Sequence, residues 1–493
     1  MNLLNVTVLA LLSLQNDFMA LAALDKPLNS TTYTNSTISP VSKISASAIG
    51  KSPQGTINLI NGTPYNWKLV NMHEYQMYWW YPDIIPAGGS FESDVKFRNN
   101  GHKDDAAEAH FILEGAPKPM SFTLQARSNP PRVEVIYHDA LSSINNPENS
   151  KHDIGFEDDG SCTFMLAGDG DFQPFTSSNP PVAWMQATFE DIEHLTLREV
   201  VQPASHDSGV DILSHKDGGI KHNTLTQTVP IYEQLKAGAR FFDIRPLYRK
   251  GKMWTAHMSL FSGNKVIGGV GRSIEEIVND VNRFTREFPG ELLTLSLSHD
   301  MNRDTGYSNF EHEQWNILFE ELLRIEALFE PIHSVVHDVD LTTLPINHFI
   351  SPGSRSAVVV RTPAGEHLEI IKKKPHAFVH YNRYPISGSW SDAQSLQFLA
   401  EDQLRKLKEW DHKNLLQSTW TITQNLAYVI DVGNPRHSII HLAKRAKKAL
   451  FAHLWPTLTT SMFPNIIEVD DYKDGKVTAL CMAINRKFAG KEY

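Results

Sequence analysis

Cysteine is scarce in this chain: among its 493 residues only Cys162 and Cys481 are present. Two cysteines are too few for the dense disulfide framework of small secreted domains. They leave two alternatives open, namely one bond between distant parts of the chain or two buried thiols.

An excess of positive charge is also missing, because 46 basic residues face 56 acidic ones and the net charge is −10. This balance argues against a general nucleic-acid binder, which would carry a basic face. No apolar run reaches the roughly 18 residues that a membrane-spanning helix needs. With 41% hydrophobic and 21% charged residues the bulk of the chain is globular, and its length suits two or three domains.

The first 25 residues contain no Lys or Arg, so the positive start of a typical secretory signal is missing. A short apolar run and the small residues of "ALAAL" nevertheless predict a signal peptide over 1–25, and hence an extracellular protein. Residues 26–52 lack periodicity and are rich in Ser and Thr, which predicts a linker. Three sequons, at Asn29, Asn35 and Asn61, predict a eukaryotic secreted glycoprotein.

Residues 53–185 alternate short apolar runs such as "RVEVIY" with turn clusters such as "PAGGS". This pattern predicts an all-β sandwich domain. One segment, "EYQMYWWYPDIIPAGG", concentrates Tyr75, Tyr78, Trp79, Trp80 and Tyr81. Such a cluster could dock on a membrane interface or on sugars. The favoured interpretation is that the rings fill the core or a domain interface.

Residues 190–493 alternate apolar strands with helical patterns, which predicts an α/β barrel or an open doubly wound sheet. In "SIEEIVNDVNRFTREF" the apolar residues recur at helical spacing, and Ser273 with Glu276 forms a capping box. The segments "HEQWNILFEELLRIEALF", "SDAQSLQFLAEDQLRKLKEW" and "SIIHLAKRAKKALFAHLWP" also predict helices. The final strand is predicted in "NIIEVDDY".

Several predicted strands end in ionisable residues, in "ASHD", "DIRP", "TAH", "LSHD", "VVRT" and "VDDY". Because the carboxyl ends of barrel strands converge on one mouth, these side chains are expected to share one site. The residues concerned are His206, Asp207, Asp243, Arg245, His257, Asp300, Arg361 and Asp471.

Two histidines and an arginine suit the cleavage of a phosphodiester. One imidazole takes the proton of the attacking hydroxyl, the other protonates the leaving oxygen, and a guanidinium stabilises the phosphoryl charge. Each histidine needs a carboxylate to fix its tautomer, and Asp207 and Asp471 are the candidates. A Zn or Mn site is the lower-ranked alternative, since no tight ligand spacing is present. The glycines of "GGVGR" at 268–272 predict a turn.

The segment from about 190 to 300 resembles the X domain of phosphatidylinositol-specific phospholipase C, of the secreted bacterial and fungal type. The motifs that carry the resemblance are "SHDSG", "TQTVPIYEQLKAGARFFDIRP", "WTAH" and "FTREFPGELLTLSLSHD". The resemblance implies a distorted (β/α)8 TIM-like barrel that cleaves a lipid phosphodiester at a membrane surface, without a cofactor or metal.

The resemblance also implies roles for individual residues. His206 is expected to be the general base, His257 the general acid and Arg245 the cation that replaces calcium. Asp207 would hold His257, and Asp471 would hold His206. The substrate-binding residues are expected to be Asp243, Ser298, Asp300, Arg361 and Tyr384.

Three positions depart from the family pattern. Met258 follows His257 where the family usually has Gly, and Ser298 stands where bacterial members have a Lys near the inositol. Asp207 follows the first histidine where the calcium-dependent animal form has Asn, which argues against a calcium site. Two functions remain open: a phosphodiesterase of inositol lipids, favoured by the retained acid–base residues, or an inactive lipid- or glycan-binding protein on the same barrel.

Overall fold

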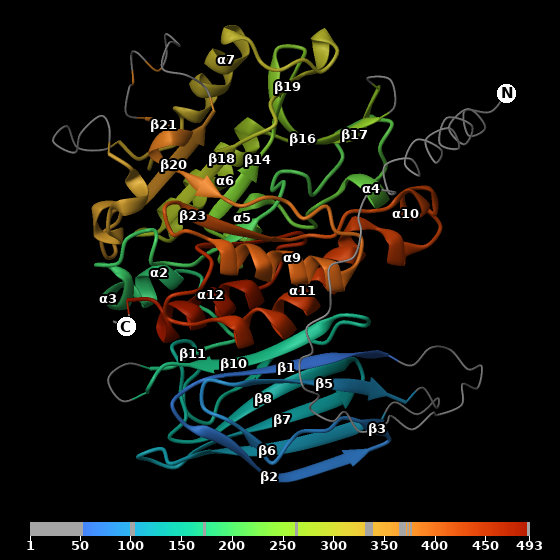
Figure 1. Cartoon of the computed structure of the whole chain (residues 1–493), viewed down its shortest axis with the longest axis vertical. Coiled ribbons are helices and arrows are strands. Elements are labelled where there is room, and N and C mark those ends of the chain that lie inside the picture. The colour runs from blue at the N-terminus through green and yellow to red at the C-terminus, as the bar shows by residue number, and fades with distance from the viewer. Residues whose placement is uncertain are drawn as a thin grey trace, which may run out of the picture. The chain divides into compact units, whose positions relative to one another are not determined.

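The computed structural model describes residues 53–98, 104–170, 174–261, 265–330, 339–363, 371, 374 and 377–490. The chain forms a mixed α/β structure (Figure 1). The predicted signal peptide and linker, with Asn29 and Asn35, lie outside these residues.

The strands between residues 54 and 177 form two sheets that pack around one apolar core; we call them the two-sheet unit. In spatial order the first sheet consists of β11 (Thr176–Ser177), β10 (Ser161–Ala167), β1 (Gln54–Gly62), β5 (Ser90–Phe97) and β3 (Met77–Tyr78). The second sheet consists of β4 (Ile84–Ile85), β2 (Asn66–Tyr75), β6 (Ala106–Glu114), β7 (Met120–Ser128), β8 (Pro131–Asp139) and β9 (Lys151–Asp153).

Strand β1 is buried on both faces, because its alternate side chains join two different cores. Ile57 and Leu59 pack inside the two-sheet unit, whereas Ile60 packs into the core that the C-terminal helices share. The aromatic segment divides in the same way. Trp79 and Tyr81 are buried in the core, while Trp80 is 51% exposed, so neither interpretation of the segment holds for all of its rings.

A second region is built on eight parallel strands, which follow one another in the order expected for a barrel. In spatial order they are β21 (Phe378–His380), β20 (Ala357–Thr362), β18 (Leu292–Leu297), β14 (Phe241–Ile244), β12 (Gln202–Ser205), β24 (Ile466–Val469), β23 (Leu415–Trp420) and β22 (Ile386–Ser387). Among the described residues β21 and β22 are not paired with each other. The sheet is therefore curled, and the closure implied by the predicted barrel is missing at this point.

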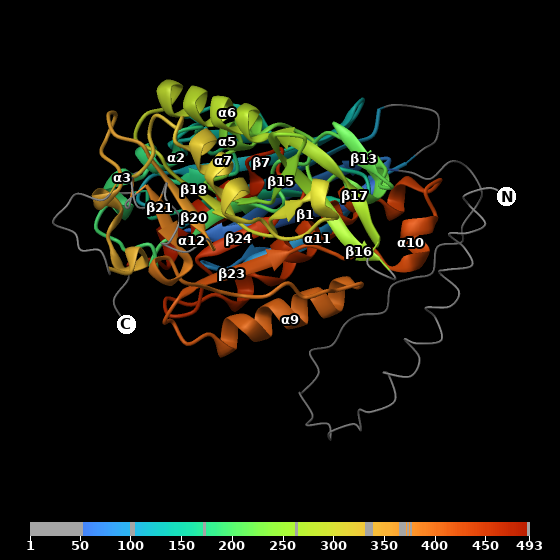
Figure 2. The same cartoon turned by 90° about the horizontal axis from the view of Figure 1, so that it is seen from above.

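Helices cover the outer face of the curled sheet and contribute to its core. They include α5 (Ile231–Lys236), α6 (Ile274–Glu287), α7 (His312–Leu322), α9 (Leu396–Glu409), α11 (Ile439–His453) and α12 (Lys476–Lys487). Figure 2 shows α5, α6 and α7 grouped together and α9 beside β23. The capping box of Ser273 and Glu276 at the start of α6 is confirmed. Helix α12 was not predicted.

The remaining strands near the sheet form a five-stranded layer with the order β13 (His215–Asp217), β17 (Lys265–Ser273), β16 (Lys252–Phe261), β15 (Pro246–Arg249) and β19 (Met301–Asn302). His257 belongs to β16, so the prediction that "TAH" ends a barrel strand is wrong. The prediction of a turn in "GGVGR" is also wrong, because these residues lie in β17. A Cβ atom on Gly268 would lie 2.0 Å from the carbonyl oxygen of His257; glycine therefore allows the close approach of the two segments.

Two predictions, which concern three residues of the two-sheet unit and α12, have an outcome. Cys162 and Cys481 are both buried free thiols. The Asn61 side chain is fully buried, and its Nδ2 donates to the carbonyl oxygens of Tyr65, Ile85 and Pro86. A glycan would replace one of the two Nδ2 hydrogens and would have to fit into a fully buried position, so the predicted sequon at Asn61 is wrong as a glycosylation site in the folded chain.

Candidate active site

Three neighbouring parallel strands end at one edge of the curled sheet, and each delivers a charged side chain there. His206 follows β12, Arg245 follows β14 by one residue, and Asp470 follows β24. Strand β12 lies between the other two, so its first side chain beyond the strand faces both neighbours. Parallel pairing therefore brings together residues up to 264 positions apart in the sequence.

The His206 ring is held from both sides. Its Nδ1 lies 2.7 Å from Oδ1 of Asp470, and its Nε2 lies 2.7 Å from a terminal nitrogen of Arg245. Arginine only donates hydrogen bonds, so Nε2 must accept and Nδ1 must donate to the carboxylate. Burial lowers the pKa of His206, and Arg245 opposes protonation too, but Asp470 outweighs both and raises the pKa to about 9. The hydrogen bond from Arg245 requires the neutral form of the ring, in which the carboxylate of Asp470 makes Nε2 strongly basic.

The sequence assigned the partner of His206 to Asp471, and the structure contradicts this assignment. Asp471 has a left-handed backbone (φ 52°), which turns its side chain away from that of Asp470. Its Oδ1 accepts a hydrogen bond from Thr228 at 2.5 Å, and its Oδ2 pairs with Lys473 at 2.8 Å. The carboxylate that orients His206 is that of Asp470.

Arg245 contacts two carboxylates in addition to the His206 ring. Its Nε is 2.9 Å from Oδ2 of Asp243, and one terminal nitrogen is 3.4 Å from Oδ2 of Asp207. Burial would raise the pKa of Asp243, but Arg245, His206 and a hydrogen bond from Ser298 lower it to about 2. Asp207 has weaker compensation, and burial raises its pKa to about 7.

His257 approaches the same site from β16. Its Nδ1 lies 2.9 Å from the carbonyl oxygen of Thr224, so Nδ1 donates and Nε2 is left for a ligand. Burial lowers the pKa of His257, and the charges of Arg245 and His206 lower it further, to about 3. The prediction that Asp207 holds His257 is wrong, since a backbone carbonyl has this position.

The segment after β18 contains the predicted residues Ser298 and Asp300 and one residue that the sequence analysis missed, His299. Ser298 donates to Oδ1 of Asp243 at 2.7 Å, and its hydroxyl also lies 2.9 Å from Nδ1 of His299. Burial lowers the pKa of His299, and Arg245 contributes in the same direction, which places this third imidazole within the field of the site. Asp300 accepts a hydrogen bond from the backbone N–H of Phe310 and so fixes the following loop.

The remaining predicted residues divide between the site and the interior. Arg361, on β20, stacks over the ring of Tyr381 at 3.7 Å and donates to Ser296 at 3.1 Å. Tyr384 is fully buried, and its hydroxyl lies 3.2 Å from that of Thr294. The predicted role of the Tyr384 side chain in substrate binding is therefore wrong. Its carbonyl oxygen accepts from Nε of Arg361 at 2.8 Å, and the ring on which Arg361 stacks is that of Tyr381.

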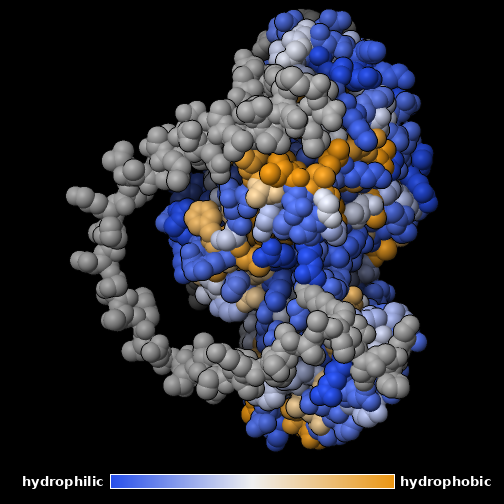
Figure 3. All heavy atoms as spheres, turned by 90° about the vertical axis from the view of Figure 1, so that its right-hand side faces the viewer, coloured by the Kyte–Doolittle hydropathy of each residue, from blue (hydrophilic) through white to orange (hydrophobic). Residues whose placement is uncertain are grey.

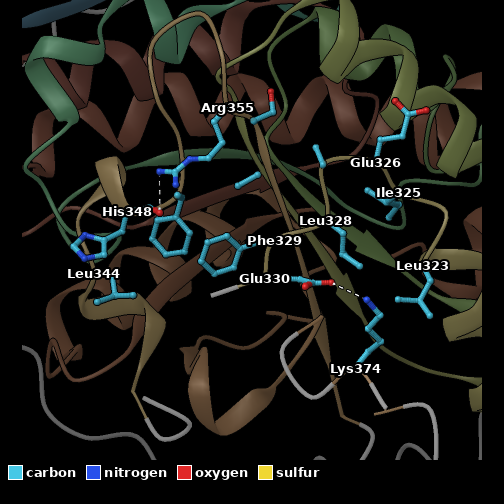
Figure 4. Close-up of a pocket in the computed structure, with 14 residues that line it drawn as sticks. Leu323, Ile325, Glu326, Leu328, Phe329, Glu330, Leu344, His348, Arg355 and Lys374 are labelled. Atoms are coloured by element: carbon cyan, nitrogen blue, oxygen red, sulfur yellow. Dashed lines mark hydrogen bonds and ion pairs between the residues drawn. The ribbon is translucent and has the colours of Figure 1, made fainter. Parts of the chain in front are cut away.

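A pocket of about 550 Å³ lies elsewhere, where the segment after α7 meets the start of β20. Figure 4 shows Phe329 beside an ion pair between Glu330 and Lys374, and Arg355 donating to the carbonyl oxygen of His348. None of the residues described above lines it. In the described part of the chain no group of three or more His, Cys, Asp or Glu side chains is arranged to hold a metal ion, and no helix is long and apolar enough to cross a bilayer.

Comparison with known proteins finds related sequences over about a quarter of the chain. A segment of 128 residues is 30% identical to a 1-phosphatidylinositol phosphodiesterase of Staphylococcus aureus, and it covers 26% of this chain and 37% of the relative. A segment of 129 residues is 26% identical to a PI-PLC X-box domain-containing protein of Dictyostelium discoideum, covering 24% of this chain and 16% of that protein. The chain thus spans well under half of the length of these relatives. No family model matches.

Solved structures of bacterial phospholipases also align with this chain. A phosphatidylinositol-specific phospholipase C mutant from Staphylococcus aureus aligns at 15% identity with a TM-score of 0.42, over 62% of this chain and 98% of that one. The corresponding enzyme from Listeria monocytogenes aligns at 14% identity with a TM-score of 0.40, over 64% and 100%.

Proposed function

We propose that this protein is a phosphodiesterase of inositol lipids that works by histidine acid–base catalysis and without a metal. The observation that carries the proposal is the row formed by Asp470, His206 and Arg245, with two contacts of 2.7 Å. A carboxylate that orients an imidazole beside a guanidinium provides both a base and a site for phosphoryl charge. The sequence similarity to phosphatidylinositol phosphodiesterases supports the choice of substrate class.

The first step transfers two protons and exchanges one bond. The inositol 2-hydroxyl attacks phosphorus and gives its proton to Nε2 of His206, while the lipid oxygen leaves with a proton from Nε2 of His257. The products are diacylglycerol and a cyclic inositol phosphate. A water molecule then opens the cyclic phosphate, with His257 as base and His206 as acid, and this restores both rings.

Arg245 also controls when the base becomes available. In the free site its nitrogen occupies Nε2 of His206, so the ring has no lone pair for an incoming hydroxyl. A phosphodiester anion offers the guanidinium two oxygens in a planar, two-pronged contact, which is stronger than the single contact with a neutral ring. Substrate binding therefore draws Arg245 from His206 and exposes the base. The same anion favours protonation of His257, whose pKa is held low by the neighbouring positive charges.

A lipid substrate requires contact with a membrane surface, and one surface near the site suits it. Helix α10 (Leu426–Ile430) and the residue that follows Asp431 expose Leu426, Ile430 and Val432. The backbone of α10 is joined to the site, because His222 contacts the carbonyl oxygen of Tyr428 and lies two residues from Thr224, which holds His257. Figure 3 shows hydrophobic side chains gathered on the side of the molecule that it displays. We expect the protein to dock peripherally there, outside the cell.

The proposal is tested with the full chain, phosphatidylinositol vesicles and EDTA. Phosphorus NMR should detect a cyclic inositol phosphate before the open phosphate appears, and the rate should be unchanged by the chelator. His206→Ala should abolish the signal. Turnover that disappears in EDTA and returns with calcium would show that Asp207 and Asp243 hold a metal. Vesicle binding without any product in the wild-type chain would show a lipid-binding protein instead.

A further inference from the structure

The two-sheet unit meets the C-terminal region through charged contacts near the end of β24. The turn between β9 and β10 supplies Glu157 and Asp159. Asp159 pairs with Arg436 at 3.0 Å, and Glu157 pairs with Lys473 at 3.1 Å. Only the second of these two pairs involves the turn after β24, which contains Lys473.

Lys473 connects two carboxylates of different parts of the chain. Its Nζ lies 3.1 Å from Oε1 of Glu157 and 2.8 Å from Oδ2 of Asp471. Asp471 is fully buried, whereas the side chains of Lys473 and Glu157 are 29% and 19% exposed. Burial would raise the pKa of Glu157, but Lys476 and Lys473 lower it, so Glu157 is a carboxylate at neutral pH and balances the charge of Lys473.

Asp471 anchors the turn that carries Asp470. Its backbone N–H donates to the carbonyl oxygen of Thr226, and its own carbonyl oxygen accepts from Lys447, both at 2.8 Å. The turn is also joined to the base, because Gln227 accepts from the N–H of Tyr472 and donates to the carbonyl oxygen of His206. A shift of this turn therefore moves Asp470 relative to the His206 ring.

We propose that Glu157 of the two-sheet unit is a positioning residue for the active site: through Lys473 and Asp471 it fixes the turn that holds Asp470 against His206. The inference rests on the proposed function, and it gives the two-sheet unit a part in catalysis. Glu157 touches neither the substrate nor the reacting atoms. Its removal leaves Lys473 with a single carboxylate partner and frees the turn on the side of the two-sheet unit.

The test compares Glu157→Gln with Asp159→Asn in the full chain. The Asp159 variant is a matched control, since it removes a charge from the same turn and breaks a different contact to the C-terminal region. Displacement of a catalytic group by about 1 Å costs about 10²-fold in rate, so we expect a smaller loss, about tenfold, in kcat for Glu157→Gln. KM for a soluble inositol phosphodiester should stay the same. The Asp159 variant should retain the wild-type kcat.

A titration of His206 by NMR of the labelled imidazole gives a readout that does not depend on turnover. The charged and titratable groups that face this ring are Asp470, Glu468, Arg245, Asp243, Asp207, His257 and His299. Weaker contact with Asp470 should lower the pKa of His206 in Glu157→Gln and leave it unchanged in Asp159→Asn. A general loss of stability would move neither value in the folded protein.

Lys473→Met provides the second variant. It should reproduce the effect of Glu157→Gln, and the double variant should be no slower than Lys473→Met alone, because the residues act in series. An unchanged His206 titration, or equal losses in the Glu157 and Asp159 variants, would overturn the inference. Absence of turnover in the wild-type chain would refute the proposed function only, since the titration would still test whether Glu157 positions Asp470.

Discussion

Replacement of Asp470 by Asn tests whether the partner of His206 is Asp470, as in the structure, or Asp471, as expected from the sequence. The hydrogen bond from Nδ1 of His206 to Asp470 is 2.7 Å long and involves a carboxylate. Hydrogen bonds to charged groups contribute about 1.5–3 kcal/mol, and one pKa unit corresponds to about 1.4 kcal/mol. Asp470→Asn should therefore lower the pKa of His206 by about 1–2 units.

Asp470→Asn should reduce kcat by more than the lower pKa of His206 alone would cause. An Asn amide can present its NH2 group to Nδ1, which forces the proton onto Nε2 and removes the lone pair that the base needs. General base catalysis contributes about 10²–10⁴-fold, so kcat should fall by this amount.

Asp471→Asn is the control for this prediction, because it removes the adjacent carboxylate. Since Asp471 anchors the turn without touching the ring, we expect a loss of about tenfold, well below that of Asp470→Asn. Cyclic phosphate formation and the NMR titration of His206 measure both effects. If Asp470→Asn keeps its rate and Asp471→Asn loses most of it, the partner of His206 in the working enzyme is Asp471 and the reasoning fails.

Further predictions concern the other catalytic groups and the surface. His257→Ala should regain about 10²–10⁴-fold on a nitrophenyl ester of inositol phosphate, whose leaving group needs no proton, whereas His206→Ala should stay inactive; rescue of His206→Ala would reverse the roles. Arg245→Lys should be slow on both substrates, since an ammonium lacks the planar two-pronged contact, and a wild-type rate would refute this. Because the folded pKa of His257 is about 3 and the usual value is about 6.5, stability falls as pH drops through this window. Between pH 7 and 4.5 the free energy of unfolding, measured with urea, should fall by about 2–3 kcal/mol less in His257→Gln than in the wild-type chain. An equal fall in both proteins would contradict the low pKa. Ile430→Ser with Val432→Ser should weaken vesicle sedimentation without changing kcat on a soluble substrate; unchanged sedimentation would place the docking surface elsewhere.

The strand ends could be predicted from sequence because each strand has a clear physical signal. Runs such as "LLTLSL" and "AVVVRT" are apolar on both faces, which is typical of parallel strands covered on both sides. Arg245 directly follows the strand "FFDI", and His206 follows the apolar pair Val200–Val201 after the four residues "QPAS". Parallel strands end at the same edge of a sheet. The positions of His206 and Arg245 at the mouth therefore follow from the pattern, whereas that of Asp470 does not.

The position of His257 could not be obtained in this way. Its strand, β16, alternates polar and apolar residues, but the sequence does not state which strands pair with it. The five-stranded layer is defined by contacts such as those of β17 with β13, and these depend on glycines that admit a neighbouring backbone. Glycine is also the common signal for a turn, so the segment 268–272 was assigned to the wrong structure.

The alternation of side chains along β24 distinguishes Asp470 from Asp471, but the sequence alone does not show which face is which. Side chains alternate along β24: Ile467 and Val469 pack against the covering helices, while Ile466 packs on the inner side with Ala204 of β12 and Phe241 of β14. If the alternation continues, Asp470 lies on the inner side, four residues after Ile466. His206 lies on the same side, because it follows the inward-facing Ala204 by two residues. The parity was not visible in the sequence, because both faces of β24 are apolar at its start. The parity distinguishes the two aspartates only once each face of β24 is assigned to its core. Asp470 then contacts His206, and Asp471, one residue further, anchors the turn.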